Sequence, residues 1–183
     1  MSSWFLRIDN ALFLIDCPKA TEEVINDLKE LSGGICPKVV LTNRDAHHEA
    51  SILNRKLGWP LIVQEQEAYL LPNVENLETF SDQLTISSAG RVLWTPGPTP
   101  GSCVLHVSPP WNVLFCGRLL IPISIDELLP LRTKSTFHWS SQEKSLINLR
   151  RWIPSKVPLE LASGVGMTSS DQGKLFPWNA WKN

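Results

Sequence analysis

The sequence predicts an α/β fold in which helices cover mixed β-sheets, and the order of its hydrophobic patterns supports this class. In the first third of the chain, short apolar runs alternate with stretches of helical periodicity. From residue 77 to residue 117 several short strands follow one another, and a further helical pattern begins near residue 140. Alternating strands and helices followed by a block of strands are typical of a layered α/β sandwich with mixed sheets.

Length, charge and composition restrict the possible classes of protein. The chain has 183 residues and 43 % hydrophobic residues, which suits one domain over residues 1–183. Its formal net charge of -1 argues against a nucleic-acid or anionic-membrane partner. No apolar run reaches the roughly 18 to 20 residues that a membrane span needs, and no secretory leader pattern precedes Trp4. We therefore expect a cytoplasmic protein.

The four cysteines are widely spaced and form no C-x-x-C pair. This spacing argues against a zinc finger or a thioredoxin-type motif. We expect them to be free thiols, mostly buried.

The first elements are predicted by turn and cap residues. Two apolar runs, 4–8 and 11–16, flank Asp9-Asn10, and this pattern predicts a hairpin because Asp and Asn tolerate a positive φ. Thr21 is suited to cap a helix that ends at Gly33-Gly34.

A polar corner follows the next strand and is the main candidate site. Residues 39–41 are an apolar β-branched run that predicts a buried strand, and a helix is expected to start soon after it. Asn43, Asp45, His47 and His48 lie between the two elements. Ligands of open α/β sheets bind at strand ends of this kind, so these side chains are candidates for binding or catalysis.

The second half of the chain combines predicted strands with one long stretch of no clear period. Residues 121–138 lack periodicity, so we expect a loop there, and Trp178 and Trp181 are expected to pack on the core rather than to form a partner surface. The other expected elements are a helix to about Leu57, a strand at 60–63, a short helix or turn at 64–71, two or three strands within 77–94, a strand at 113–116, a helix from residue 140 or 141 through 152 and a strand with a glycine loop at 159–166.

Five motifs, taken together and in this order, resemble the metallo-β-lactamase-fold family. They are Leu-Ile-Asp-Cys-Pro at 14–18, Leu-Thr-Asn-Arg-Asp-Ala-His-His at 41–48, Thr-Pro-Gly-Pro-Thr-Pro-Gly-Ser at 95–102, Leu-Phe-Cys-Gly-Arg at 114–118 and Ala-Ser-Gly-Val-Gly at 162–166. The resemblance covers nearly the whole chain. It implies an αββα four-layer sandwich, and it suggests a two-metal hydrolase of thioesters, lactams, phosphoesters or similar bonds.

The metal ligands of the family are mostly replaced in this chain. The family motif H-x-H-x-D-H aligns with residues 43–48, where only His48 is of the matching type. The replacements are Asn43 and Asp45 for histidines, His47 for an aspartate, Pro98 for a histidine, Arg118 for the bridging aspartate and Val165 for the last histidine.

These replacements argue against a dinuclear metal site. Proline and valine cannot ligate, and a guanidinium about 4 Å from a divalent ion repels it by roughly 8 kcal/mol at an effective dielectric of 20. Asp45 and His48 remain weak candidates for a single ion, since His47 and His48 point about 100° apart on a helix. Without a metal, we expect His48 to be hydrogen-bonded at the helix N-terminus and His47 to be partly exposed. We therefore expect no cofactor, with one zinc or iron ion as the alternative.

Arg118 itself has two interpretations. It could hold an anionic ligand such as a carboxylate or phosphate in place of the metal. It could also pair with Asp45 or Asp16 and close the corner, and of these two acids Asp45 is the expected partner.

The leading hypothesis is a binding or scaffold protein with a degenerate metal site. Its partner would be a small anionic ligand or another protein, and homo-oligomers are possible. The alternative is a metal-dependent hydrolase of esters or thioesters with an atypical or mononuclear site.

Overall fold

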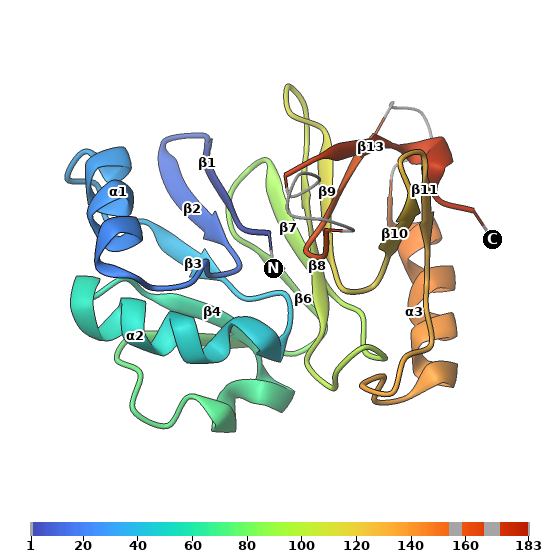
Figure 1. Cartoon of the computed structure of the whole chain (residues 1–183), viewed down its shortest axis with the longest axis horizontal. Helices are drawn as coiled ribbons and strands as arrows, with labels where there is room; N and C mark the ends of the chain where they lie inside the picture. Colours follow the sequence, from blue (N-terminus) through green and yellow to red (C-terminus); the bar gives the residue numbers. More distant parts are fainter. Residues whose placement is uncertain (1, 154–158, 167–172, 183) are drawn as a thin grey trace.

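The chain folds into four layers, as its patterns predict. The computed structural model describes residues 2–153, 159–166 and 173–182. Figure 1 shows two β-sheets packed face to face, with α1 (Glu22–Ser32) and α2 (His47–Leu57) outside one sheet and α3 (Trp139–Trp152) outside the other. The predicted αββα sandwich is therefore confirmed.

The first sheet is mixed and begins with the predicted hairpin. β1 and β2 are antiparallel, and the turn between them places Asp9 at φ 54°. The pairs β2–β3, β3–β4 and β4–β5 are parallel. In sheet order the strands are β1 (Trp4–Ile8), β2 (Ala11–Ile15), β3 (Lys38–Val40), β4 (Leu61–Gln64) and β5 (Leu77–Phe80).

The second sheet is antiparallel except where β9 and β12 run parallel. In sheet order its strands are β13 (Leu175–Pro177), β12 (Glu160–Ser163), β9 (Val113–Gly117), β8 (Cys103–Val107), β7 (Gly90–Trp94) and β6 (Gln83–Thr85). A separate two-stranded sheet pairs β10 (Ile121–Ser124) with β11 (Glu127–Leu129), and short 3-10 helices are η1 (Arg44–Ala46), η2 (Glu65–Leu70) and η4 (Trp178–Ala180).

The helix boundaries follow from their cap residues. Thr21 Oγ1 accepts a hydrogen bond from the Val24 amide at 3.3 Å, which begins α1. Gly33 and Gly58 adopt left-handed conformations and end α1 and α2. Across the described residues, no helix combines the length and the apolar character that a membrane crossing requires.

Three clusters of buried side chains fill the three interfaces between layers. Phe13, Ile62 and Leu105 belong to the cluster between the sheets. Leu53 belongs to the cluster on the helix-bearing side of the first sheet, and Leu149 to the one beneath α3. Burying one such side chain contributes roughly 1.5–3 kcal/mol, so these interfaces hold the layers together.

The stretch expected to be a loop at residues 121–138 contains the β10–β11 hairpin, so that prediction was wrong in part. Leu128 of this hairpin is fully buried and forms a bridge with Trp181. Trp181 is 6 % exposed, and its ring lies edge-on to that of Trp178 at 5.1 Å. The prediction that these two tryptophans pack on the core is confirmed. The sequence did not indicate the hairpin because strands of four and three residues are too short to show a clear period.

Candidate functional site

The predicted site lies where strand ends from both sheets meet. The Asp16 amide donates to the Val40 carbonyl at 2.9 Å, which joins the ends of β2 and β3. The Gly164 amide donates to the Gly117 carbonyl at 2.8 Å, which joins the ends of β12 and β9. A hydrogen bond joins the two sheets here: the amide of Cys103, at the start of β8, donates to the carbonyl of Thr42, just after β3, at 2.9 Å.

We call this region the corner and define it by Asp16, Thr42, Asn43, Asp45 and Arg118. A glycine is required beside it, since Gly117 has a φ of 51° and a Cβ there would lie 2.5 Å from Thr42 Oγ1. This close approach of the backbone to Thr42 sets the position of Arg118.

Asp16 is bound to the backbone of the corner and does not pair with Arg118. Its Oδ1 accepts from the Thr42 amide at 2.8 Å, and its Oδ2 accepts from the Thr42 hydroxyl at 2.6 Å. The side chain is 2 % exposed, and this burial raises the pKa of Asp16 to about 6. Asp16 therefore ties β2 to β3.

Asn43 is also engaged within the chain. Its Oδ1 accepts from the Asp45 amide at 3.0 Å and caps η1, while its Nδ2 donates to Thr42 Oγ1 at 3.0 Å. A side-chain oxygen accepting from the amide two residues on is an Asx-type turn. Asn43 thus orients the turn that carries Asp45.

Arg118 makes the contact that the sequence predicts. Its Nη1 donates to Asp45 Oδ2 at 2.8 Å, and its Nη2 donates to Ser135 Oγ at 2.7 Å. The Arg118 side chain is 16 % exposed and that of Asp45 is 45 % exposed. The predicted pair is confirmed, and it lies at the surface of the corner rather than in the interior.

The two histidines have the opposite exposure to the one expected. Sequence reasoning placed His47 partly in solvent and His48 in a hydrogen bond, but His47 is buried and His48 is exposed. The reason is helical geometry, because His47 lies on the same stripe of α2 as the buried Ala50 and Asn54. Burial lowers the pKa of His47, and neither ring nitrogen has a hydrogen-bond partner among the described residues.

Glu67 is a buried acid that the sequence analysis missed. It is fully buried, its Oε1 accepts from Arg44 Nε at 2.9 Å, and its Oε2 lies 3.9 Å from His47 Nε2. A Cβ on Gly101 would lie 2.6 Å from Glu67 Cγ, so the Thr-Pro-Gly loop covers this carboxylate directly. No motif in the sequence marks Glu67, because it meets Arg44 from 23 residues away.

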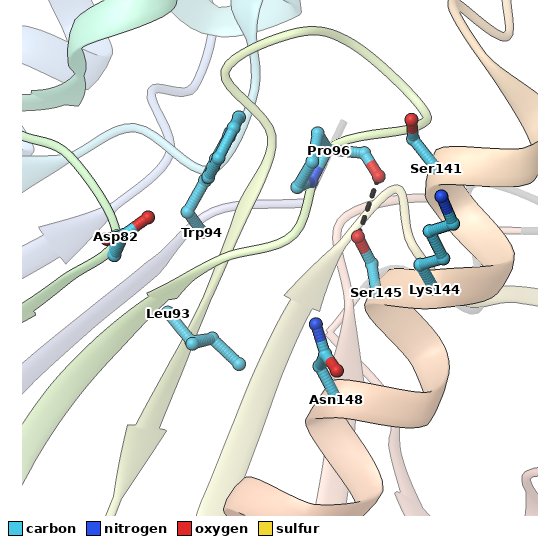
Figure 2. Close-up of a pocket in the computed structure, with 8 residues that line it drawn as sticks. All are labelled: Asp82, Leu93, Trp94, Pro96, Ser141, Lys144, Ser145 and Asn148. Carbon is cyan, nitrogen blue, oxygen red and sulfur yellow. Dashed lines mark hydrogen bonds between the residues drawn. The ribbon is translucent and has the colours of Figure 1, made fainter.

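The loop that carries Pro98 is held by α3 and by the segment just before it. The Pro98 carbonyl accepts from the Phe137 amide at 3.2 Å, and the Pro96 carbonyl accepts from Ser145 Oγ at 2.7 Å. A cavity of about 360 Å³ lies beside this second bond, and Figure 2 shows the side chains that line it. It is lined by Asp82, Leu93, Trp94, Pro96, Ser141, Lys144, Ser145 and Asn148.

Val165 lies next to the corner at the end of β12. Its amide donates to Ser163 Oγ at 3.2 Å, and its side chain is half-buried. The structure thus brings together Asp16, Asn43, Asp45 and Arg118, and it sets Val165 beside them.

The fold was compared with known proteins. No protein-family model and no curated protein matches the chain. Among solved structures, the BLEG-1 B3 metallo-β-lactamase is similar with 20 % identity and a TM-score of 0.71, over 97 % of this chain and 89 % of that one. The protein TTHA1623 in a di-iron-bound form is 19 % identical, with a TM-score of 0.65 over 90 % and 86 % of the two chains.

A third similar structure is an N-acyl homoserine lactone hydrolase with its product at the catalytic metal centre. It is 17 % identical, with a TM-score of 0.64 over 87 % of this chain and 78 % of that one. The chain therefore has the metallo-β-lactamase fold, as its motifs suggested, and the fold is one used by metal-dependent hydrolases.

These neighbours contradict our expectation that the chain takes no cofactor, and we correct it, since solved proteins of this fold include metal-bound ones. The corner offers few donors to a metal of this kind. Among the described residues, no three His, Cys, Asp or Glu side chains come together as a metal would need. Asp45 is bonded to Arg118, the Asn43 side-chain oxygen accepts from the Asp45 amide, and both Asp16 oxygens accept from Thr42. The residues present therefore do not fit the dinuclear centre of the fold.

Proposed function

We propose that this chain uses the metallo-β-lactamase fold as a binding protein, in which the Arg118 guanidinium recognises a small anionic ligand at the corner. In this proposal it does not work as a dinuclear hydrolase. It acts as one domain over residues 1–183, in the cytoplasm.

The bonding of Arg118 is the observation that carries this proposal. A guanidinium has five N–H donors, and Asp45 and Ser135 take one each. The other three have no partner among the described residues. Arg118 is also the group that stands where the resemblance places a bridging aspartate, so the charge of this position is reversed from negative to positive.

The geometry favours an oxyanion that can exchange with Asp45. Asp45 accepts through one oxygen only and is nearly half exposed, so its carboxylate can return to water at little cost. A carboxylate or phosphate that engages the guanidinium with two parallel bonds gains both strength and fixed orientation. The expected ligand therefore carries a terminal carboxylate or phosphate group.

A thermal-shift titration tests the proposal. Malonate and inorganic phosphate are added to the wild-type protein, with sodium chloride at equal ionic strength as the reference. A ligand that binds only the folded state raises Tm, and we expect a rise of several degrees that Arg118→Gln abolishes. Arg55→Gln, which changes an exposed arginine near the end of α2, is the matched control and should respond like the wild type. Equal shifts in all three proteins would reject the role of Arg118.

The fold neighbours favour a second candidate, a metal-dependent hydrolase of esters or thioesters with an atypical site. Its ligands would include Asp45 and His48, of which Asp45 now pairs with Arg118. Ester and thioester hydrolysis should be assayed with added zinc or iron. Metal-dependent turnover that disappears in both Asp45→Asn and His48→Asn would replace the binding proposal with this one.

A further inference from the structure

The strand β1 is an edge of the first sheet. Among the described residues it pairs with β2 alone, so its other side has no strand beside it. Its sequence, Trp-Phe-Leu-Arg-Ile, is rich in residues that favour strands and contains no proline. Proteins usually protect such edges with prolines, inward charges or a covering segment, and an edge without them pairs readily with another strand.

An apolar groove of about 310 Å³ runs along this edge. Trp111 is 57 % exposed and Leu175 is 37 % exposed, which is unusual for large apolar side chains that lie together. The ring of Trp4 meets that of Phe115 edge-on at 5.6 Å within it. The lining consists of Trp4, Phe5, Leu6, Arg7, Trp111, Val113, Phe115 and Leu175.

The side chains on the two sides of β1 determine which groups an added strand would contact. Trp4 and Leu6 pack with the cluster between the sheets, and Phe5 packs with the cluster on the helix-bearing side. Because side chains alternate along a strand, Arg7 lies on the same side as Phe5. A strand beside β1 would therefore place alternate residues in the apolar groove and the residues between them beside Arg7.

Arg7 supplies the charge preference. It is exposed and has no acidic partner among the described residues. A second copy of β1 would bring another arginine but no acid, so it would not supply the missing negative charge.

We propose that β1 and its groove bind an extended peptide segment of a partner protein by strand addition, with apolar residues facing the groove and an acidic residue facing Arg7. Main-chain hydrogen bonds to the open edge would give affinity, and the groove and Arg7 would give selectivity. This site is separate from the corner and does not depend on the function proposed there.

The test uses a labelled peptide, acetyl-Val-Glu-Val-Glu-Val-amide, and fluorescence anisotropy with the full chain. We expect saturable binding that Trp111→Ala weakens about tenfold, since exposed aromatic anchors dominate such contacts. Phe137→Ala removes a similarly exposed aromatic (60 % exposed) away from the groove and should leave the affinity unchanged. Circular dichroism confirms that each variant is folded.

Two further probes separate strand addition from other modes. A peptide with alternate backbone amides N-methylated keeps its side chains but cannot pair with β1, so it should not bind. Arg7→Gln should weaken the glutamate peptide several-fold and leave a Val-Thr-Val-Thr-Val analogue unaffected.

Three results would overturn the proposal. The first is equal binding of the N-methylated peptide, which would indicate general apolar adsorption. The second is binding of decanoate in the groove without any binding of peptide. The third is a stable homodimer that Trp111→Ala dissociates and that the peptide does not disturb.

Discussion

The pair between Arg118 and Asp45 allows a quantitative prediction. At 2.8 Å two unit charges attract by about 1.5 kcal/mol at the dielectric constant of water and about 6 kcal/mol at an effective dielectric of 20. Asp45 is 45 % exposed, so the pair lies toward the first limit. Ordering two side chains reduces the gain further, and measured exposed pairs contribute about 1 kcal/mol or less. We expect a coupling energy of about 1 kcal/mol.

The assay is a double-mutant cycle of Arg118→Gln and Asp45→Asn, measured by urea unfolding. The coupling energy should fall in 1 M salt, where the Debye length is about 3 Å. Arg55→Gln combined with Asp45→Asn is the control, and its effects should add. A coupling above 3 kcal/mol would mean that the pair is buried, and a coupling that 1 M salt leaves unchanged would mean that the pair is shielded from solvent. Either result would refute the exposure that the structure gives to this pair.

Three further predictions concern the stability of the corner and of the core beside it. Burial raises the pKa of Asp16 to about 6, so between about pH 4 and pH 6 the folded state holds a proton that the unfolded state has lost, and the free energy of unfolding falls by roughly 3 kcal/mol as pH rises through this range. Urea unfolding at several pH values should show that Asp16→Asn removes this fall, and the same pH dependence in the variant and the wild type would contradict it. Gly117→Ala should lower the free energy of unfolding by about 2 kcal/mol or more, because of its positive φ and the contact with Thr42, and an unchanged urea midpoint would disagree. Trp181→Ala should cost about 3–5 kcal/mol by the same assay, while the exposed Phe137→Ala should cost under about 0.5.

Local signals in the sequence were sufficient for most of the fold. The turn at Asp9, the cap at Thr21 and the glycine stops at Gly33 and Gly58 each act through their own backbone conformation, so they can be identified without knowing the rest of the chain. The β10–β11 hairpin could not, since its strands of four and three residues are too short to show a clear period.

Contacts of the candidate site between motif positions could be predicted from the sequence. Contacts that depend on how the helix and the loops pack could not. The Arg118–Asp45 contact followed from two motif positions and from the need of a cation for a counter-charge. The burial of His47 depends on which stripe of α2 faces the core, and the motif alone did not indicate this. Glu67 has no motif, and only the packing of Gly101 on it reveals that the loop covers a carboxylate.

Anomalous diffraction from crystals soaked in selenate tests the central claim most directly. The claim predicts a selenium peak within hydrogen-bond reach of the Arg118 guanidinium, with the Asp45 carboxylate displaced into solvent. Data collected at the zinc and iron edges from the same crystals provide the contrary case. A peak from bound metal between Asp45 and His48, with Arg118 turned away from the corner and no selenate beside it, would contradict the account.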